Sequence, residues 1–187
     1  SAILKDCAAR PNPYVEAFAH GLLGFVVSIA ADRVDDALQR MAAYRRDAPK
    51  RFEIHFFNWS CERTEIERYR GEPEQAWAMH LEDAQVIKKM IFLRTPWMMT
   101  EYQRARGMNA LCAAERRSDP AELIAVARAA AKVCLKQPLI NAEAHGRLLL
   151  AGAAAQAAAV AAAVRELRRV IPIFERCEMA GYLAASQ

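Results

Sequence analysis

Apolar side chains recur at intervals of three and four residues along most of the chain, and they do not alternate with polar ones. The segment after position 50 is typical, with Phe52, Phe56, Trp59, Ile66 and Tyr69. This spacing places them on one side of an α-helix, whereas a half-buried strand needs alternation with period two. Three further groups repeat it: Trp77, Leu81, Ala84 and Ile91; Met98, Ala105, Met108 and Cys112; Leu123, Val126, Ala130 and Val133. The pattern predicts an all-α fold without β-strands.

Prolines divide this pattern into segments of similar length. They stand at positions 49, 73, 96, 120 and 138, and proline suits the first helical turn because it lacks a backbone N–H and has a fixed φ. Thr95 and Asp119 precede two of these prolines and can cap a helix, while Gly71 is suited to end one. Asp119 can accept a hydrogen bond from an exposed backbone amide. The predicted helices cover residues 14–31, 33–47, 50–70, 73–93, 96–117, 120–136, 139–151 and 155–177.

Short connections between these segments predict how the helices pack. Helices joined by few residues lie antiparallel, and a two-helix unit that repeats every 40 to 47 residues or so is typical of a helical solenoid. Pro172 lies inside the last segment and should bend or end that helix. Small residues on the predicted packing stripes allow close helix contact: Ala37, Ala76, Ala105, Ala127 and Ala130. The sequence predicts one domain over residues 1–187, built from stacked antiparallel helix pairs.

Composition narrows the class of protein. A content of 54% hydrophobic and 26% charged residues excludes a disordered chain. The net charge of +4 comes from basic residues interleaved with acidic ones, which does not favour nucleic-acid binding. The apolar stretches 17–31 and 148–164 are too short to span a membrane, and we find no signal-peptide pattern. The five cysteines form no CxxC pair, which favours reduced thiols and a cytoplasmic protein. A first residue of Ser is consistent with a piece of a longer chain.

The histidines do not form a metal-binding pattern. His20, His55, His80 and His145 lie on different predicted helices. Glu82 and Asp83 beside His80, or Glu143 beside His145, are possible co-ligands, but residues one or two apart do not share a helix face. No nucleophile elbow is present. The sequence predicts no catalytic residue, cofactor or metal, and an all-α enzyme with a metal held by His and Glu stays a third alternative.

Several motifs resemble a known family. They are Tyr69-Arg70-Gly71 followed by Ala76-Trp77, then Phe92-Leu93-Arg94, then residues 104–111 (RARGMNAL) and residues 174–185 (FERCEMAGYLAA). Together they resemble the tetratricopeptide-like region that follows the catalytic domain in many bacterial eukaryotic-like serine/threonine protein kinases. The resemblance spans residues 52 to 182 and implies a right-handed solenoid with a regulatory role. The Gly-rich loop, catalytic loop and metal-binding motif of a kinase are absent from this sequence, so any kinase activity would lie elsewhere in the parent chain.

Aromatic and basic side chains gather in the middle of the chain. Trp, Tyr and Arg most often anchor protein interfaces, and the first helices of stacked pairs line a concave surface. The partner-binding residues predicted here are Arg63, Arg70, Arg94, Trp97, Tyr102 and Arg104. The simpler interpretation is that the tryptophans fill the core and the arginines pair with neighbouring acids.

The predicted function follows from these features. We expect a non-catalytic regulatory or scaffolding module that binds a protein segment or self-associates, and that binds neither nucleic acid nor a membrane through this region. The apolar N-terminal helix, with Gly21 and Gly24, could pair with a second copy to give a homodimer. The alternative is a small-ligand sensor with a pocket between the helices near the tryptophans.

Overall fold

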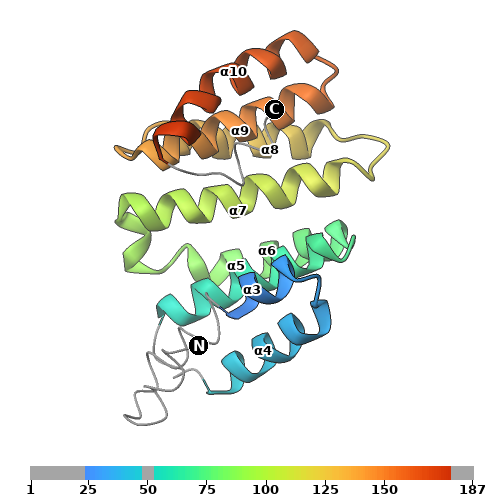
Figure 1. The fold of residues 1–187 in the computed structure, drawn as a ribbon, viewed down its shortest axis with the longest axis vertical. Helices are drawn as coiled ribbons and strands as arrows, with labels where there is room; N and C mark the ends of the chain where they lie inside the picture. The colour runs from blue at the N-terminus through green and yellow to red at the C-terminus, as the bar shows by residue number, and fades with distance from the viewer. Residues whose placement is uncertain (1–23, 48–52, 178–187) are drawn as a thin grey trace. The chain divides into compact units, whose positions relative to one another are not determined.

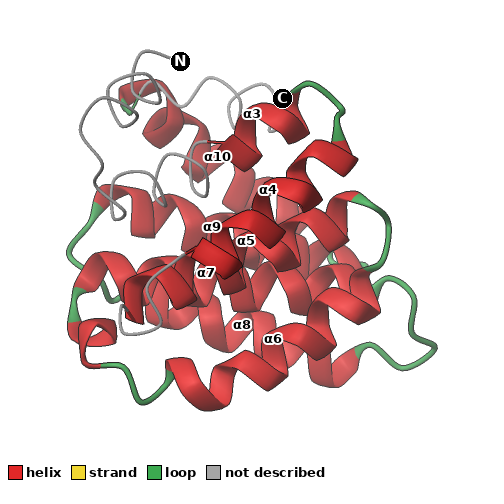
Figure 2. Cartoon of the chain, turned by 90° about the horizontal axis from the view of Figure 1, so that it is seen from below, coloured by secondary structure: helices red, strands yellow, loops and turns green. Residues whose placement is uncertain are grey.

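The computed structural model describes residues 24–47 and 53–177, and these residues form helices joined by short turns (Figure 2). No β-strand occurs in these two ranges, which confirms the all-α prediction. The chain divides into two compact units between Met90 and Ile91. The single domain expected over residues 1–187 stays a prediction.

The first unit is built around a central helix. Its helices are α3 (Gly24–Ala30), α4 (Val34–Asp47), α5 (Glu53–Tyr69) and α6 (Pro73–Ile87). The α5 helix packs against α3, α4 and α6. One cluster of buried residues in its core consists of Phe25, Ala37, Met41, Tyr44 and Ile66. Of the predicted helix 14–31, only the part from Gly24 lies within the described residues, and the predicted start at Pro49 lies outside them.

The second unit is a succession of longer helices (Figure 1). It contains a short 3-10 helix, η2 (Ile91–Arg94), then α7 (Pro96–Ala114), α8 (Ala121–Cys134), α9 (Ile140–Gln156) and α10 (Val160–Arg176). Each α-helix packs against the next one, and α7 also contacts α9. The last pair is joined by a cluster of Ala144, Val170, Ile173 and Phe174.

The predicted helix starts are close to the observed ones. Pro73 and Pro96 occupy the first turns of α6 and α7, and Thr95 is the extended residue before Pro96. The α8 helix begins one residue after Pro120, and Asp119 Oδ1 accepts a hydrogen bond from the N–H of Ala121 at 3.2 Å, as predicted. The prolines at positions 73, 96, 120 and 138 therefore mark helix starts to within two residues, because their missing N–H is harmless there.

Three helix ends share one backbone motif. After α5, Gly71 has a φ of 81°, and the N–H of Glu72 bonds to the carbonyl of Glu67 at 2.9 Å. This is a Schellman ending with a left-handed residue, which confirms Gly71 as a helix stop. Asp32 after α3 and Ala158 after α9 take the same conformation, with φ values of 54° and 56°. Neither was predicted, because only glycine enters this region without strain.

Three predicted helix boundaries need correction. The helix predicted over 73–93 ends at Ile87, and the 3-10 helix follows because Met90 and Leu93 turn inward before Pro96. The helix predicted to stop at 151 continues to Gln156, since Gly152 serves close packing: a Cβ there would lie 2.8 Å from a methyl carbon of Leu111. Consequently the last helix begins at Val160 instead of 155. It also continues through Pro172, which is exposed.

Burial confirms the small residues and corrects part of the apolar stripes. The five alanines predicted at packing positions are all at most 3% exposed. In contrast, Leu81 and Tyr69 are each 48% exposed and Ile91 is 70% exposed, although all were placed on core stripes. Tyr69 instead donates its hydroxyl to Asp32 Oδ1 at 2.8 Å. No helix within the described residues is both long and apolar enough to cross a membrane.

Candidate interaction surface

The α10 helix has two sharply different sides. One side buries Ala163, Val170, Ile173 and Phe174, which lie three, four and seven residues apart and form a continuous helical stripe. The opposite side carries the exposed residues Ala161, Val164, Arg165, Arg168, Arg169, Pro172, Glu175 and Arg176. We call this second side the α10 outer face. It combines small apolar groups with an excess of positive charge.

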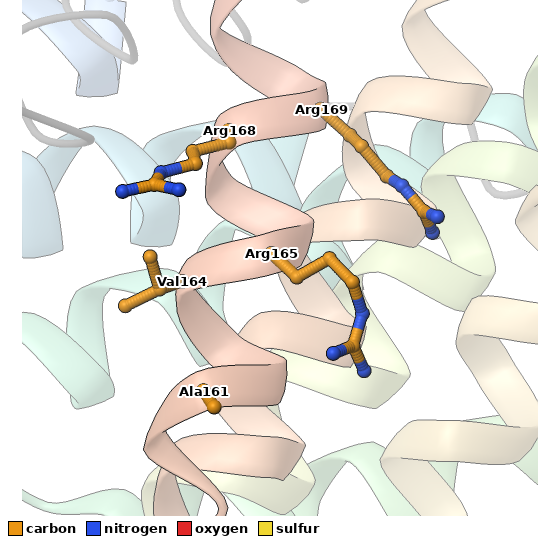
Figure 3. Close-up of a pocket in the computed structure, with 5 residues that line it drawn as sticks. All are labelled: Ala161, Val164, Arg165, Arg168 and Arg169. Atoms are coloured by element: carbon orange, nitrogen blue, oxygen red, sulfur yellow. The ribbon is translucent and has the colours of Figure 1, made fainter.

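A hollow of about 550 Å³ lies on this face and is lined by Ala161, Val164, Arg165, Arg168 and Arg169. Arg165 and Arg169 extend to one side of the helix, whereas Val164 and Arg168 extend to the other (Figure 3). Ala161 therefore lies between the two sets of arginines, and Val164 lies beside Arg168 at one edge of the hollow. Val164 is 39% exposed, which is substantial for a valine on a helix.

The arginines of this face differ in their contacts. Arg169 donates to Glu166 Oε1 at 2.8 Å, and the other oxygen of Glu166 accepts from Arg147 on α9 at 3.1 Å. Arg165 and Arg168 make no hydrogen bond or ion pair with any residue in the described ranges. A guanidinium group has five N–H donors and binds carboxylates through two parallel hydrogen bonds. These two side chains are therefore available to an anionic partner.

In the first unit, the structure places the predicted binding residue Arg63 in an internal network. Its Nε and Nη2 donate to Asp83 Oδ2 at 3.1 and 2.7 Å, and its guanidinium lies 4.2 Å from the ring centre of Trp59. Arg70 is half-exposed and donates to both oxygens of Glu67. Arg63 thus links α5 to α6, and this contact occupies the donors expected for a partner.

In the second unit, the other four predicted residues divide into two kinds. Arg94 is exposed at the end of η2, and Trp97 is 48% exposed in the first turn of α7. Tyr102 is buried, and Arg104 donates from Nε to Glu101 at 2.9 Å. Arg94 and Trp97 can contact a partner directly, whereas Tyr102 and Arg104 lie in internal contacts.

Titratable groups from α7, α8 and α9 gather around Glu101. His145 Nε2 is 4.0 Å from Glu101 Oε1, and burial together with the nearby Arg104 lowers the pKa of His145 to about 4. Burial, with Glu101 nearby, raises the pKa of the Cys134 thiol to about 11. At neutral pH the imidazole is therefore uncharged and the thiol stays protonated, so Cys134 is not the thiolate that nucleophilic chemistry requires.

Glu62 is the least expected buried group of the first unit. It is 2% exposed, and neither carboxyl oxygen has a hydrogen-bond partner among residues 24–47 and 53–177. It shares a helical stripe of α5 with His55, which is hydrogen-bonded to Tyr44 of α4 at 2.7 Å, and with Ile66 of the core. Burial, with a smaller effect of Glu65, raises its pKa to about 8. The group is therefore mostly protonated at neutral pH.

The histidine pairs considered as metal ligands serve other contacts. His80 stacks on Trp77 with ring centres 5.6 Å apart, and His145 lies beside Glu101 instead of Glu143. No group of three or more His, Cys, Asp or Glu residues is placed to hold a metal ion in the described part of the chain. The α10 outer face is the surface that sequence reasoning missed. Its signal was the placement of Arg165, Arg168 and Arg169 opposite the buried apolar stripe.

Comparison with known proteins adds no further constraint. Neither the protein-family models, nor the curated protein sequences, nor the solved structures contain a match to this chain.

Proposed function

We propose that the chain is a tetratricopeptide-like helical-repeat interaction module that docks a protein segment on the α10 outer face. The observation that carries the proposal is Arg165 and Arg168 beside the exposed Val164, without internal ion pairs in the described residues. Successive helices that pack through short connections support the repeat architecture. Stacked helical repeats commonly form extended surfaces that bind other proteins.

The chemistry of the face specifies the partner. The strip of Ala161 and Val164 can bury the apolar side of a helix, as in helix-in-groove recognition. The flanking guanidinium groups select carboxylates, because arginine pairs with them through two hydrogen bonds. The preferred partner is therefore an acidic amphipathic helix.

The wider role follows from the family resemblance. Residues 52–182 resemble the region beside the catalytic domain of bacterial signalling kinases, and a docking face there would recruit a substrate or regulator to the kinase. On this proposal the module itself carries no catalytic step. The gene sequence upstream of residue 1 tests the kinase context independently of any binding experiment.

Fluorescence anisotropy tests the docking proposal. The probe is a fluorescein-labelled synthetic helix with leucines on one side and glutamates flanking them, and its counterpart has glutamine in place of glutamate. We expect the acidic probe to bind, and the variant Arg165→Glu/Arg168→Glu to weaken binding about tenfold or more, since a loss of about 1.4 kcal/mol is tenfold in affinity. Val164→Asn should weaken it by a separate route, because it removes the apolar contact without adding a charge.

The control variant is Arg128→Glu/Lys132→Glu, which reverses the same amount of charge at two exposed positions of α8. Circular dichroism confirms that each variant folds. Equal binding of the acidic and the glutamine probe, or equal weakening in the control variant, would contradict the proposal. Tight binding of a duplex DNA oligonucleotide through Arg165 and Arg168 would also contradict it, because the partner would then be nucleic acid.

A further inference from the structure

The exposed side of α6 has the opposite charge from the α10 outer face. Between Pro73 and Ile87 the sequence contains three acidic residues and neither Lys nor Arg. Asp83 is buried against Arg63, whereas Glu74 is exposed and the Glu82 side chain is 80% exposed. Leu81 stands beside Glu82 and is 48% exposed. We call this side the α6 outer face.

The two faces also match in their spacing. On α6 the exposed Glu74, Ala78, Leu81, Glu82 and Gln85 lie at intervals of three and four residues. They therefore form one stripe of the helix. Ala161, Val164, Arg165, Arg168 and Pro172 repeat this spacing on α10.

The charges lie at equal separations along the two helices. Glu74 and Glu82 are separated by the same number of residues as Arg168 and Arg176, a rise of about 12 Å along a helix. All four side chains are exposed. Each stripe thus offers apolar groups beside charges of one dominant sign.

We infer that the α6 outer face of a second copy is a partner of the α10 outer face. This inference rests on the proposed function, and it names the acidic amphipathic helix as one that the chain itself carries. In an antiparallel contact with Glu82 of the second copy opposite Arg168, Glu74 would reach Arg176, and Leu81 would pack beside Arg168 at the end of the apolar strip. The same contact would then cover the exposed Leu81 and the two arginines that form no ion pair within the described part of the chain.

The geometry of this pairing is head-to-tail. Different faces meet, so each copy keeps one α6 face and one α10 face open after pairing, and a third copy can add unless the rotation closes a ring. A contact between two single helices is smaller than the standard interface of about 1,600 Å². We therefore expect weak association, with a dissociation constant of about 10 to 100 µM, which weakens further as salt screens the charges.

Sedimentation velocity of the full chain, from about 1 µM to about 200 µM, spans the expected range. The weight-average sedimentation coefficient should rise with concentration, and the rise should shrink in about 0.5 M salt. Two variants should each stay monomeric: Arg165→Glu/Arg168→Glu on α10 and Glu74→Lys/Glu82→Lys on α6. Because Glu82 lies 3.9 Å from Arg63, a second α6 variant, Glu74→Lys/Gln85→Lys, leaves that pair intact.

Mixing the two reversed variants provides the decisive measurement. The mixture contains two matched contacts. The unaltered α6 face of the α10 variant can meet the unaltered α10 face of the α6 variant, and the acidic α10 face can meet the basic α6 face. An equimolar mixture should therefore assemble although each component alone does not. Loss of folding cannot produce such a rescue. The Arg128→Glu/Lys132→Glu variant should assemble as the wild type does.

Three results would overturn the inference. They are a wild type that stays monomeric over the whole range, assembly that neither face variant reduces, and a mixture that fails to assemble although both variants are folded. The anisotropy experiment separates this failure from failure of the proposed function. A monomeric chain that still binds the acidic helix through Arg165 and Arg168 has the proposed docking face but another partner.

Discussion

The central helices of the two units, α5 and α9, bury different kinds of side chain. In the first unit, α5 buries polar side chains, including His55, Asn58, Glu62 and Glu67. In the second unit, the buried positions of α9 are mostly alanine and glycine, and three glycines of α7 and α9 touch neighbouring leucines so closely that a Cβ would clash. The first unit should therefore be sensitive to changes of charge, and the second to changes of volume.

The largest expected effect is the pH dependence caused by Glu62. Its folded pKa of about 8 lies above the ordinary 4.5, so the folded protein keeps a proton that the unfolded chain releases. The contribution to stability is fully present below pH 4.5 and is lost as the pH rises through about 8. The full loss is on the order of 5 kcal/mol. Glu62→Gln, which cannot ionise, should remove this loss.

Urea unfolding of the wild type and of Glu62→Gln at several pH values measures this effect. The difference between the two proteins isolates Glu62 from His55 and His145, whose pKa values are lowered by burial. We expect similar stability in acid and a more stable variant in alkali. Parallel pH curves for the two proteins would show that Glu62 does not titrate as described.

The next largest effect should come from Arg63→Ala. The substitution leaves Asp83 buried without its guanidinium partner, which costs about 3 kcal/mol for a pair of this kind. Arg169→Ala is the matched control, because its ion pair with Glu166 is more exposed and should change the free energy of unfolding by less than about 1 kcal/mol. Unfolding by urea measures both. Equal effects would mean that Arg63 is a surface residue free to bind a partner.

Gly146→Ala tests the close packing of the second unit. A Cβ at this position would lie 2.8 Å from Leu135 Cγ and 3.0 Å from the backbone oxygen of Ala131. Because a backbone oxygen cannot move without shifting α8, we expect a loss of about 2 kcal/mol. Gly152→Ala meets mainly one terminal methyl of Leu111, and its gain in helix propensity of about 1 kcal/mol offsets the contact. Similar melting temperatures for the two variants would contradict this distinction.

The smallest effect compares two left-handed helix ends. Ala158→Gly should stabilise the protein by about 0.5 to 1 kcal/mol, because glycine adopts the positive φ without the Cβ strain. Asp32→Gly should give no such gain, since it removes the acceptor of the Tyr69 hydroxyl. Calorimetric melting temperatures distinguish the two. A gain at Asp32 equal to that at Ala158 would show that the Tyr69 contact contributes nothing.

The sequence predicted the helices better than it predicted the surface. Proline chemistry is local, so Pro73, Pro96 and Pro120 located helix starts without knowledge of the neighbouring helices. The end of α9 could not be found in this way, because Ala158 carries no sequence signal for a left-handed conformation. The predicted end at residue 151 was wrong for a related reason: the helix continues through Gly152, whose missing side chain leaves room for Leu111 of another helix.

The predicted binding residues also could not be assigned from sequence alone, because their contacts come from other helices. An arginine beside an aromatic residue is compatible both with a binding surface and with an internal pair. Arg63 belongs to the second kind only because Asp83, on another helix, reaches it at 2.7 Å. The α10 outer face could have been found from sequence. Helical periodicity alone separates the apolar residues of α10, on one side of the helix, from its arginines on the other.

The reactivity of the buried Cys134 thiol can be used to measure local opening of the second unit. The side chain is inaccessible and its pKa is about 11, so a thiol-reactive reagent can modify it only when α7, α8 and α9 separate. Cys61, Cys112 and Cys177 are partly accessible and reduced, and they would be consumed first. The slow phase of labelling would then measure how often this helical layer opens under native conditions.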